Sequence, residues 1–578
     1  MKINQKVCHY PRLNPLRGCD TIDRLRAIQP GREFMKKSDT EKPSAFSRRS
    51  LLKSASGAVL GAAAASLTGA RAQVTGLTPE GGGPPFRLAM GALDFLDRKT
   101  YAHNMEVVAY LPGSTISGGE PLMALWARGR QRLLPANGGF VDITEPRKPV
   151  VMNRGLTRGP GAVVYNTSLK KWIMMCTAAA PLTSATPEFP NGAYDKELRD
   201  RTVNFKGLRG IRNYDITDPI KPNLLQEYST GEKGNGTHHN FYDGGKYAYL
   251  DCGWDDQLRM ENHQRPYSNA IMIVDMSDPA HVKEVSRWWV PGQRLGEEAE
   301  YKKYLFAGDR ASWSGNHGAL SVPRRVEDGG NVGYGGFGAF GMYVMDLSDV
   351  TKPKPFGKVQ YEFDAIGTIP FHTCYPVVAD PAHPRLQNIV IAAHEALEAD
   401  CREVYHTPYV VDVKDPRNPK IIGLFPRPQA PPDAPYTDFC FSRGRFGSHN
   451  TQCWLAPGKS RPEIIAIAWF NAGVRVFDLS NPTAPKEVAW FVPPHEGEMK
   501  DYESWWRGST ENVFVEFDRN LIWIGTHEGS YCLSCPALGK PVLEPRKVER
   551  WSIPHCNVGW DDQTPRSFYF GRSLSRMA

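Results

Sequence analysis

One pattern of apolar and polar positions recurs along most of the chain. Each copy reads apolar, apolar, Asp, apolar, Ser or Thr, any residue, Pro, two further residues and Pro, with small departures. The apolar run is typical of the end of a β-strand, Asp and the hydroxyl residue favour a turn, and proline stops the strand. Six copies occupy residues 140–149, 213–222, 273–282, 344–353, 410–419 and 476–485, and a degenerate seventh occupies residues 532–541.

The spacing of the copies predicts the fold class. The repeated Asp, with Cys532 in its place in the seventh copy, recurs at intervals of 54 residues (478 to 532) to 73 residues (142 to 215). This interval accommodates one four-stranded blade with its loops, so the sequence predicts an all-β, seven-bladed β-propeller. Residues 555–570 begin like a further blade, which leaves eight blades as an alternative. We expect residues 85–99 to add the outer strand of the last blade.

The repeats resemble those of the LVIVD-repeat family of seven-bladed propellers, over roughly residues 100–560. The resemblance implies the fold. It implies no activity, because propellers carry many unrelated functions. The chain therefore divides into an N-terminal extension (1–72), a segment with a role in ring closure (73–99) and the propeller (100–578).

The basic excess of the chain lies in its first 72 residues. They contain 14 Lys and Arg against 5 Asp and Glu, whereas the remainder contains 56 (70 − 14) and 57 (62 − 5), a net charge of −1. A near-neutral propeller offers no electrostatic basis for binding nucleic acid or an anionic membrane.

The same extension resembles a twin-arginine signal peptide. Arg48 and Arg49 precede an alanine-rich apolar run at residues 55–67, and residues 70–72 read Ala-Arg-Ala, a cleavage signature before Gln73. The run is too short for a stable membrane span. It predicts export by the twin-arginine translocase to the periplasm or beyond, a route that often carries folded proteins with a cofactor in place. Met35 is a more usual start for such a signal than Met1.

Five histidines occupy one structural position, the head of a blade. Each lies 29 to 40 residues before a repeat Asp. The first strand of a blade lines the central channel, so these side chains are predicted to converge on the axis. Of the adjacent pair at 238 and 239, only His239 shares the His-Asn sequence of two other members. The five are His103, His239, His317, His372 and His449.

Convergent imidazoles predict a transition-metal site. Three or four histidines on rigid strands hold iron, copper or zinc and leave a coordination position open. The alternative is a ring of channel histidines that bond only water and backbone. In concept the arrangement is similar to two propeller families, the carotenoid-cleaving oxygenases with iron and the selenium-binding proteins, including methanethiol oxidase, with copper. That likeness favours iron or copper over zinc, and dioxygen as a reactant.

Three glutamates are candidates for acid–base or ligand-orienting roles. Glu511 opens blade 7, and Glu395 and Glu528 follow histidines at the ends of second strands. These strand ends are predicted to reach one mouth of the channel. The alternative is that they are exposed turn residues.

Cysteine use is less informative. Nine cysteines follow residue 72, and an odd number leaves at least one unpaired. Cys532 and Cys535 form a CxxC sequence on a propeller turn, which favours a local disulfide or free thiols over a redox motif.

The sequence therefore predicts an exported metal-dependent oxidoreductase or oxygenase that acts on a small organic molecule, with dioxygen as a candidate second reactant. Two alternatives remain at this point. One is a binding or scaffold propeller without chemistry, and the other is a zinc-dependent hydrolase or lyase.

Overall fold

The computed structural model describes residues 97–552, with longer gaps at 114–124, 181–199, 258–267, 307–312, 361–368 and 496–508 and several gaps of one to three residues. The signal-like extension, the tail from 553 and the strand predicted at 85–99, apart from residues 97–99, lie outside the described residues, and residues 97–99 are not in a strand. Short helical segments join some strands; those with defined bounds are α6 (Glu298–Tyr301), η4 (Val326–Asp328), η5 (Pro384–Leu386), η6 (Phe439–Phe441) and η7 (Pro536–Leu538).

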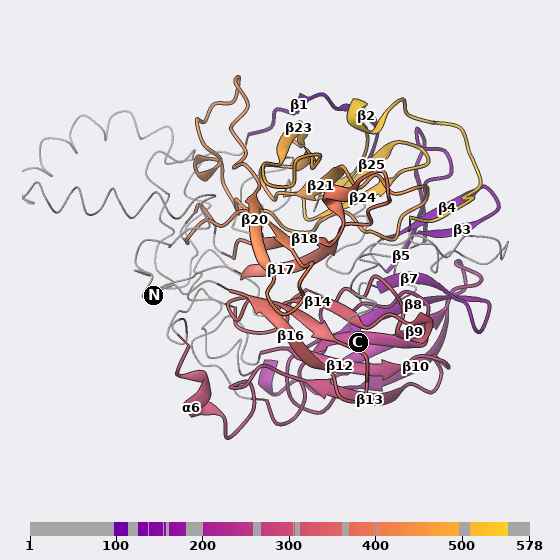
Figure 1. Ribbon diagram of the computed structural model, residues 1–578. Helices are drawn as coiled ribbons and strands as arrows, with labels where there is room; N and C mark the ends of the chain where they lie inside the picture. Colours follow the sequence, from indigo (N-terminus) through magenta and orange to yellow (C-terminus); the bar gives the residue numbers. More distant parts are fainter. Residues whose placement is uncertain are drawn as a thin grey trace, which may run out of the picture.

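The described strands form seven antiparallel sheets, which are the blades of a seven-bladed β-propeller (Figure 1). Blade 1 contains β3 (Trp126–Arg128), β4 (Gln131–Ala136), β5 (Gly139–Asp142) and β6 (Val150–Asn153). Blade 2 contains β7 (Gly161–Asn166), β8 (Lys171–Ala178), β9 (Gly210–Asp215) and β10 (Asn223–Ser229). Blade 3 contains β11 (Tyr247–Cys252), β12 (Ala270–Asp275) and β13 (Lys283–Trp288). Blade 4 contains β14 (Val332–Gly336), β15 (Met342–Asp346) and β16 (Lys354–Val359).

The remaining blades continue the series. Blade 5 contains β17 (Ile369–Pro376), β18 (Ile389–Glu395), β19 (Tyr409–Asp412) and β20 (Lys420–Leu424). Blade 6 contains β21 (Ile464–Ala468), β22 (Val474–Asp478) and β23 (Lys486–Val492), with β1 (Tyr101–His103) on its outer edge. Blade 7 contains β24 (Asn512–Glu516), β25 (Leu521–Gly525), β26 (Gly529–Ser534) and β2 (Glu106–Pro112). The prediction of seven blades is confirmed.

The repeated Asp ends the third strand of each of the first six blades. Its Oδ1 accepts a hydrogen bond from the backbone N–H two residues later, at 2.7 to 3.0 Å in every copy. This side-chain turn replaces the next ladder bond and lets the chain reverse into the fourth strand. The repeat is therefore a strand-end signal, as the sequence pattern predicts.

The seventh copy is in a different register from the one predicted. Ser534, and not Cys532, pairs with Leu521 at the start of the second strand, as the repeat Asp does in other blades. The bulge between the third and fourth strands also falls two residues before Ser534, as it does before Asp478. Cys532 lies inside β26, and both Cys532 and Cys535 are buried free thiols.

The ring closes with strands from the N-terminal side. β2 supplies the fourth strand of blade 7 by pairing with β26, and β1 adds a further strand to β23 of blade 6. The prediction that residues 102–107 open blade 1 is therefore wrong, and blade 1 begins instead at β3.

A buried ion network joins blade 7 to blade 1. Arg132 of β4 contacts Glu516 at 2.7 Å and Asp518 at 2.6 Å, and the Arg132 and Glu516 side chains are fully buried. Arg519 contacts Glu516 at 2.6 Å and donates to the Ile143 carbonyl of blade 1. Burial opposes ionisation of Glu516, but the two guanidiniums outweigh it and lower the pKa of the carboxyl.

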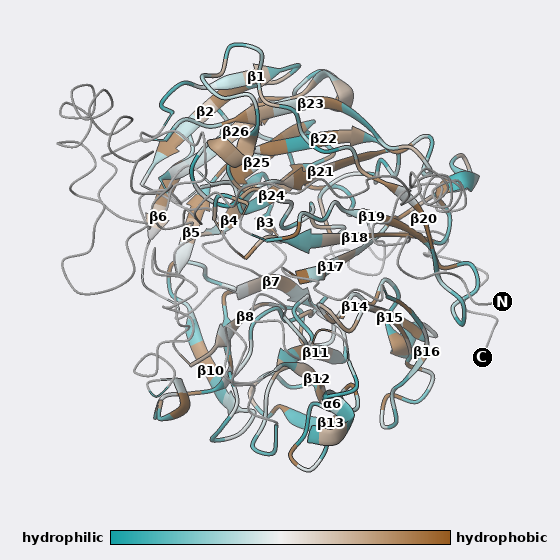
Figure 2. Cartoon of the chain, turned by 90° about the vertical axis from the view of Figure 1, so that its left-hand side faces the viewer, coloured by the Kyte–Doolittle hydropathy of each residue, from teal (hydrophilic) through white to brown (hydrophobic). Residues whose placement is uncertain are grey.

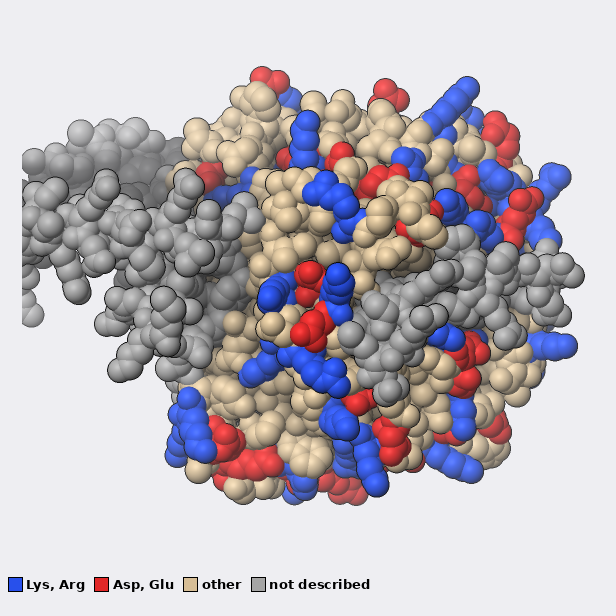
Figure 3. All heavy atoms as spheres, viewed as in Figure 1, with Lys and Arg blue, Asp and Glu red and all other residues tan. Residues whose placement is uncertain are grey.

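Apolar side chains fill the blades and the spaces between them. Figure 2 shows hydrophobic segments mostly in the strands and hydrophilic segments mostly in the connections. Trp126, Trp254, Trp469 and Trp523 are the largest fully buried apolar side chains. On the face shown in Figure 3, basic and acidic side chains are interspersed. Within the described part of the chain, no helix is long and apolar enough to cross a membrane.

We predict that Glu516→Gln lowers the free energy of unfolding by about 3–5 kcal/mol, because it leaves buried guanidiniums without their shared carboxylate. Denaturant titration at neutral pH measures the loss. Glu300→Gln, which removes an exposed partner of Lys303, is the matched control and should cost less than about 1 kcal/mol.

The comparison of wild type with Glu516→Gln can also be made as a function of pH. Because folding lowers the pKa of Glu516, its contribution is present above the ordinary pKa of about 4.3 and is lost as the pH falls through the folded value. The gap between wild type and Glu516→Gln should therefore narrow in acid. A gap that is constant with pH would contradict an ionic role for Glu516.

Candidate metal centre

The innermost strand is irregular in the blades that carry the predicted histidines. In blade 3, residues 237–241 pair with β11 as two isolated bridges, Thr237–Cys252 and Phe241–Tyr249, and not as a continuous strand. The inner segments of blades 4 and 6 likewise join β14 and β21 through isolated bridges. In blade 5, β17 is regular except for a register shift between Ile369 and Thr373, which brackets His372. Such interruptions re-aim side chains and are common beside functional sites.

Five histidines form one continuous cluster across blades 3 to 6. The ring centroids are 4.4 Å apart for His238 and His239, 4.7 Å for His238 and His317, 4.5 Å for His317 and His372, and 4.8 Å for His372 and His449. All are buried except His238, which is partly exposed. We call these five residues together with Glu395 the histidine cluster. The structure thus brings together four of the five predicted histidines.

Glu395, at the end of β18, lies in the middle of the histidine cluster. Its Oε2 is 3.4 Å from Nε2 of His372 and 3.6 Å from Nε2 of His317, and its Oε1 is 3.8 Å from Nε2 of His449. These distances are long for hydrogen bonds. The first two equal the roughly 3.3–3.6 Å edge of a tetrahedron of ligands about 2.0–2.2 Å from one ion, and the third is slightly longer. The donor atoms are therefore spaced as ligands of a shared cation.

The potential ligands fall into two groups. In each, one ligand atom per residue lies within 4.8 Å of the others. The first group is His317, His372 and Glu395, all buried, and the second is His238, His239 and His317. Neutral imidazole and carboxylate suit iron, copper and zinc, so the residues fit the metal that the sequence predicts.

Arg445 orients the carboxylate of Glu395. Its Nη1 contacts Oε1 of Glu395 at 2.6 Å, which leaves Oε2 toward His317 and His372. The Arg445 guanidinium also lies 5.2 Å from the ring centroid of Phe470. Carboxylate ligands are usually held by such outer hydrogen bonds.

The backbone of Glu511 fixes the tautomer of His449. Nδ1 of His449 donates to the Glu511 carbonyl at 2.9 Å, so Nε2 carries the lone pair and faces Glu395. Glu511 thus orients a cluster residue through its main chain.

His394 connects Glu395 to blade 6 through its contact with Ser448. It is buried, and its Nδ1 lies 2.8 Å from the hydroxyl of Ser448, which itself donates to the His394 carbonyl. Burial, followed by the charges of His406 and His449, lowers the pKa of His394 well below its ordinary value, so this imidazole is neutral at neutral pH. Ser448 directly precedes His449, which couples the end of β18 to the inner segment of blade 6.

Glycine and aromatic residues enclose the cluster. A Cβ on Gly318 or Gly336 would clash with the carbonyl oxygen of His372, so both glycines allow blades 4 and 5 to approach closely. Trp313 packs edge-on against His317 at 5.5 Å, and Phe470 stacks on His449 at 4.7 Å. These rings give the site apolar walls.

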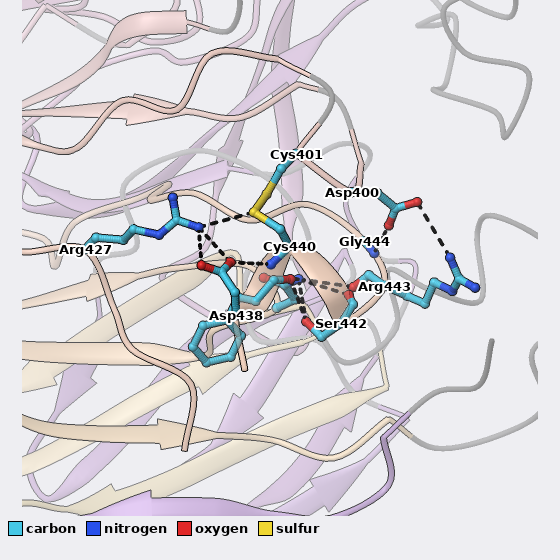
Figure 4. Close-up of a disulfide and its surroundings, with 10 residues drawn as sticks. Asp400, Cys401, Arg427, Asp438, Cys440, Ser442, Arg443 and Gly444 are labelled. Atoms are coloured by element: carbon cyan, nitrogen blue, oxygen red, sulfur yellow. Dashed lines mark hydrogen bonds and ion pairs between the residues drawn. A yellow bond between two sulfur atoms is a disulfide. The ribbon is translucent and has the colours of Figure 1, made fainter. Parts of the chain in front are cut away.

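A disulfide braces the two loops around the site. Cys401, in the connection after β18, bonds Cys440, in the connection before β21 (Figure 4). Beside it, the Asp400 N–H donates to the Gly444 carbonyl at 2.8 Å, and Ala399 pairs with Arg445. On the other side, Arg427 contacts Asp438 at 2.6 Å. The disulfide therefore helps to fix Arg445 relative to Glu395.

Two predicted site residues lie elsewhere. His103 is exposed on β1, pairs with Trp490 and stacks on its ring, so its predicted place at the head of an inner strand is wrong. The reason is that an outer closing strand has the same alternation as an inner one. Glu528 is half-buried in the turn before β26, where its carbonyl accepts from Gly113, and neither ligand group includes it.

Sequence reasoning missed His238 and Arg445. His238 was left out because only His239 shares the His-Asn sequence of His103 and His449. Arg445 lies four residues before His449, and its contact with Glu395 joins residues 50 positions apart. The adjacent His-His pair was the available signal for the first. No local pattern indicated the second.

The fold and site define a seven-bladed β-propeller with a buried cluster of histidines and one glutamate on its inner segments. Residues 267–289 and 466–491 match the LVIVD repeat, so the chain carries LVIVD repeats. Each match contains the third and fourth strands of a blade and the Asp turn between them. No curated protein matches the chain significantly.

Solved structures resemble the chain only distantly. Raptor from Chaetomium thermophilum has 10% identity and a TM-score of 0.38, with 80% of this chain and 30% of that chain covered. The C-terminal WD40 domain of Sif2 has 8% identity and a TM-score of 0.36, with 76% and 97% covered. The chain thus spans about a third of the Raptor chain, and likeness at this level does not bear on function.

We predict that Cys401→Ala/Cys440→Ala lowers the free energy of unfolding by about 3 kcal/mol, because the disulfide closes a loop with a sequence separation of 39. Urea titration with and without reductant measures it. Reductant should destabilise wild type by a similar amount and leave the double variant unchanged. Equal sensitivity of both proteins would show that this disulfide is not the one that stabilises the fold.

Proposed function

We propose that the histidine cluster binds a transition-metal ion and that the protein is a metal-dependent oxidoreductase acting on a small organic molecule. The observation that carries this proposal is the set His317, His372 and Glu395, two imidazoles and one carboxylate that are buried at ligand spacing, the first on blade 4 and the other two on blade 5. A set of two histidines and one carboxylate with open positions is typical of non-haem iron enzymes that use dioxygen.

The protein's own groups support this proposal in three ways. Arg445 balances the charge of Glu395 and holds its orientation, and the Glu511 carbonyl holds His449 with Nε2 available as a further ligand. Trp313 and Phe470 restrict water around the cluster. A bound iron or copper ion would supply redox chemistry at an open position, and the walls would hold an apolar or aromatic substrate beside it.

Metal content tests the proposal. We expect mature protein, purified without a His-tag or chelator, to contain near-stoichiometric iron or copper by elemental mass spectrometry. His372→Ala/Glu395→Gln should lose this metal by at least tenfold, because it removes two of the three ligands. The control is His281→Ala, which removes an exposed histidine paired with Asp278.

The outcomes separate the alternatives. Iron or copper with oxygen consumption supports oxidation. Stoichiometric zinc would overturn it in favour of hydrolase or lyase chemistry, since two histidines and a glutamate also bind catalytic zinc. No metal, even after anaerobic reconstitution with iron, copper and zinc, would leave a binding or scaffold propeller.

We also propose export by the twin-arginine pathway, supported by Arg48, Arg49 and the Ala-Arg-Ala sequence at 70–72. We expect mass spectrometry of the exported protein to show an N-terminus at Gln73. Arg48→Lys/Arg49→Lys should abolish export, whereas Arg24→Lys/Arg26→Lys should not. Export of the first variant at the wild-type level would contradict this route.

A further inference from the structure

We propose that the histidine cluster holds a second metal ion, bound by His238 and His239 on the partly exposed side of the first. This inference rests on the proposed function, because the first ion occupies the group that contains Glu395. It goes beyond that function by assigning two ions to one centre, and it is carried by the geometry of blade 3.

The side chains of His238 and His239 point to the same side of the chain, although neighbouring side chains on an extended strand alternate. Neighbouring side chains on a regular strand point to opposite faces. Here the rings of His238 and His239 both lie against His317, with centroids 4.7 Å and 5.2 Å away. Between the bridges Thr237–Cys252 and Phe241–Tyr249, four residue steps oppose three, so the inner segment has one extra residue and its side-chain alternation is shifted. The ladder is interrupted where both imidazoles are aimed at the cluster.

Asp251 accepts hydrogen bonds from the backbone of both His238 and His239. The Asp251 carbonyl accepts from the His238 N–H at 3.0 Å, and its Oδ2 accepts from the His239 N–H at 3.2 Å. Asp251 is fully buried, and its own N–H donates to Asn240 at 3.1 Å. The pair is therefore positioned before any ion binds, with a buried acidic residue close to it that favours a cation there.

His317 connects the two ligand groups. A neutral imidazole offers one lone pair, so His317 binds one ion at a time. When it joins His238 and His239, the outer ion has three imidazole ligands. The inner ion then keeps His372 and Glu395, and Nε2 of His449 lies 3.8 Å from Oε1 of Glu395, next to that ion. Two ions about 3.5–4 Å apart are a known arrangement in enzymes.

The two positions differ in affinity. The inner group includes a carboxylate and is buried, whereas the outer group consists only of imidazoles and includes the partly exposed His238. We therefore expect the outer ion to bind more weakly and to retain contact with water. An imidazole-only group favours copper or zinc over a harder cation.

Copper titration of the metal-free mature protein tests the proposal, with Cu²⁺ as the probe. We expect two equivalents per chain by elemental analysis after desalting, and an electron paramagnetic resonance signal below two spins per chain, because close copper ions couple. His238→Ala should retain one equivalent with a full single-ion signal. His372→Ala/Glu395→Gln should retain at most the outer equivalent, and His281→Ala should match wild type.

His238 is partly exposed, so its replacement should preserve the fold, which thermal unfolding checks. If His238→Ala is unstable, His238→Gln keeps the size of the side chain and loses the imidazole. One equivalent in wild type, lost in the His372/Glu395 variant, would overturn the second position and leave the proposed function standing. Two equivalents unaffected by either His238 variant would place the second ion elsewhere and overturn the proposal. No bound copper at all would overturn the second position, and it would overturn the proposed function as well if the metal-free protein also takes up no iron.

Discussion

Closure of the ring is the constraint on which the rest of the structure depends. Inner strands from different blades converge only if the first and last blades meet, and here they meet through β2 on β26 and through the buried carboxylate of Glu516. That carboxylate is shared by guanidiniums from β4 and from the loop after β24, so one group links two blades that are far apart in sequence. A buried pair of this kind adds little net stability over an apolar contact, yet it is costly to break, and it fixes which blades are neighbours. The described cluster residues belong to blades 3 to 6, away from this junction.

The seven blades share one repeat but differ in their innermost strand. β3, β7 and β24 are continuous strands in blades 1, 2 and 7, whereas the inner segments of blades 3, 4 and 6 are reduced to isolated bridges and that of blade 5 is bulged. The outer strands carry the fold, because they pair along their length as continuous strands and, in the first six blades, end in the Asp turns. The inner segments of blades 3 to 6 give up ladder bonds where the histidines lie. A local rule broken in consecutive blades at the same position is typical of a functional site.

The sequence predicted the blades and most of the cluster because both depend on local repetition. The Asp turns predicted the strand ends, and counting from them located His239, His317, His372 and His449. His103 was misplaced because alternation cannot distinguish a closing strand from an opening one. His238 was left out because it does not share the His-Asn sequence, although the irregular pairing of blade 3 brings its ring against His317. The Cys401–Cys440 pair could not be derived, since the connectivity of nine cysteines is not encoded in their spacing.

The contact between Arg445 and Glu395 explains how such a cluster is stable within the fold. A carboxylate that is 4% exposed among imidazoles would be expensive to bury alone. Arg445 compensates its charge at Oε1, and the strap of Ala399, Asp400 and the disulfide holds the loop that carries Arg445 against the strand that carries Glu395. Because that compensation uses only one oxygen, Oε2 is kept in place between His317 and His372 at ligand spacing. The residues that stabilise the carboxylate are therefore also the ones that pre-organise it, and little rearrangement is needed for a cation to bind there.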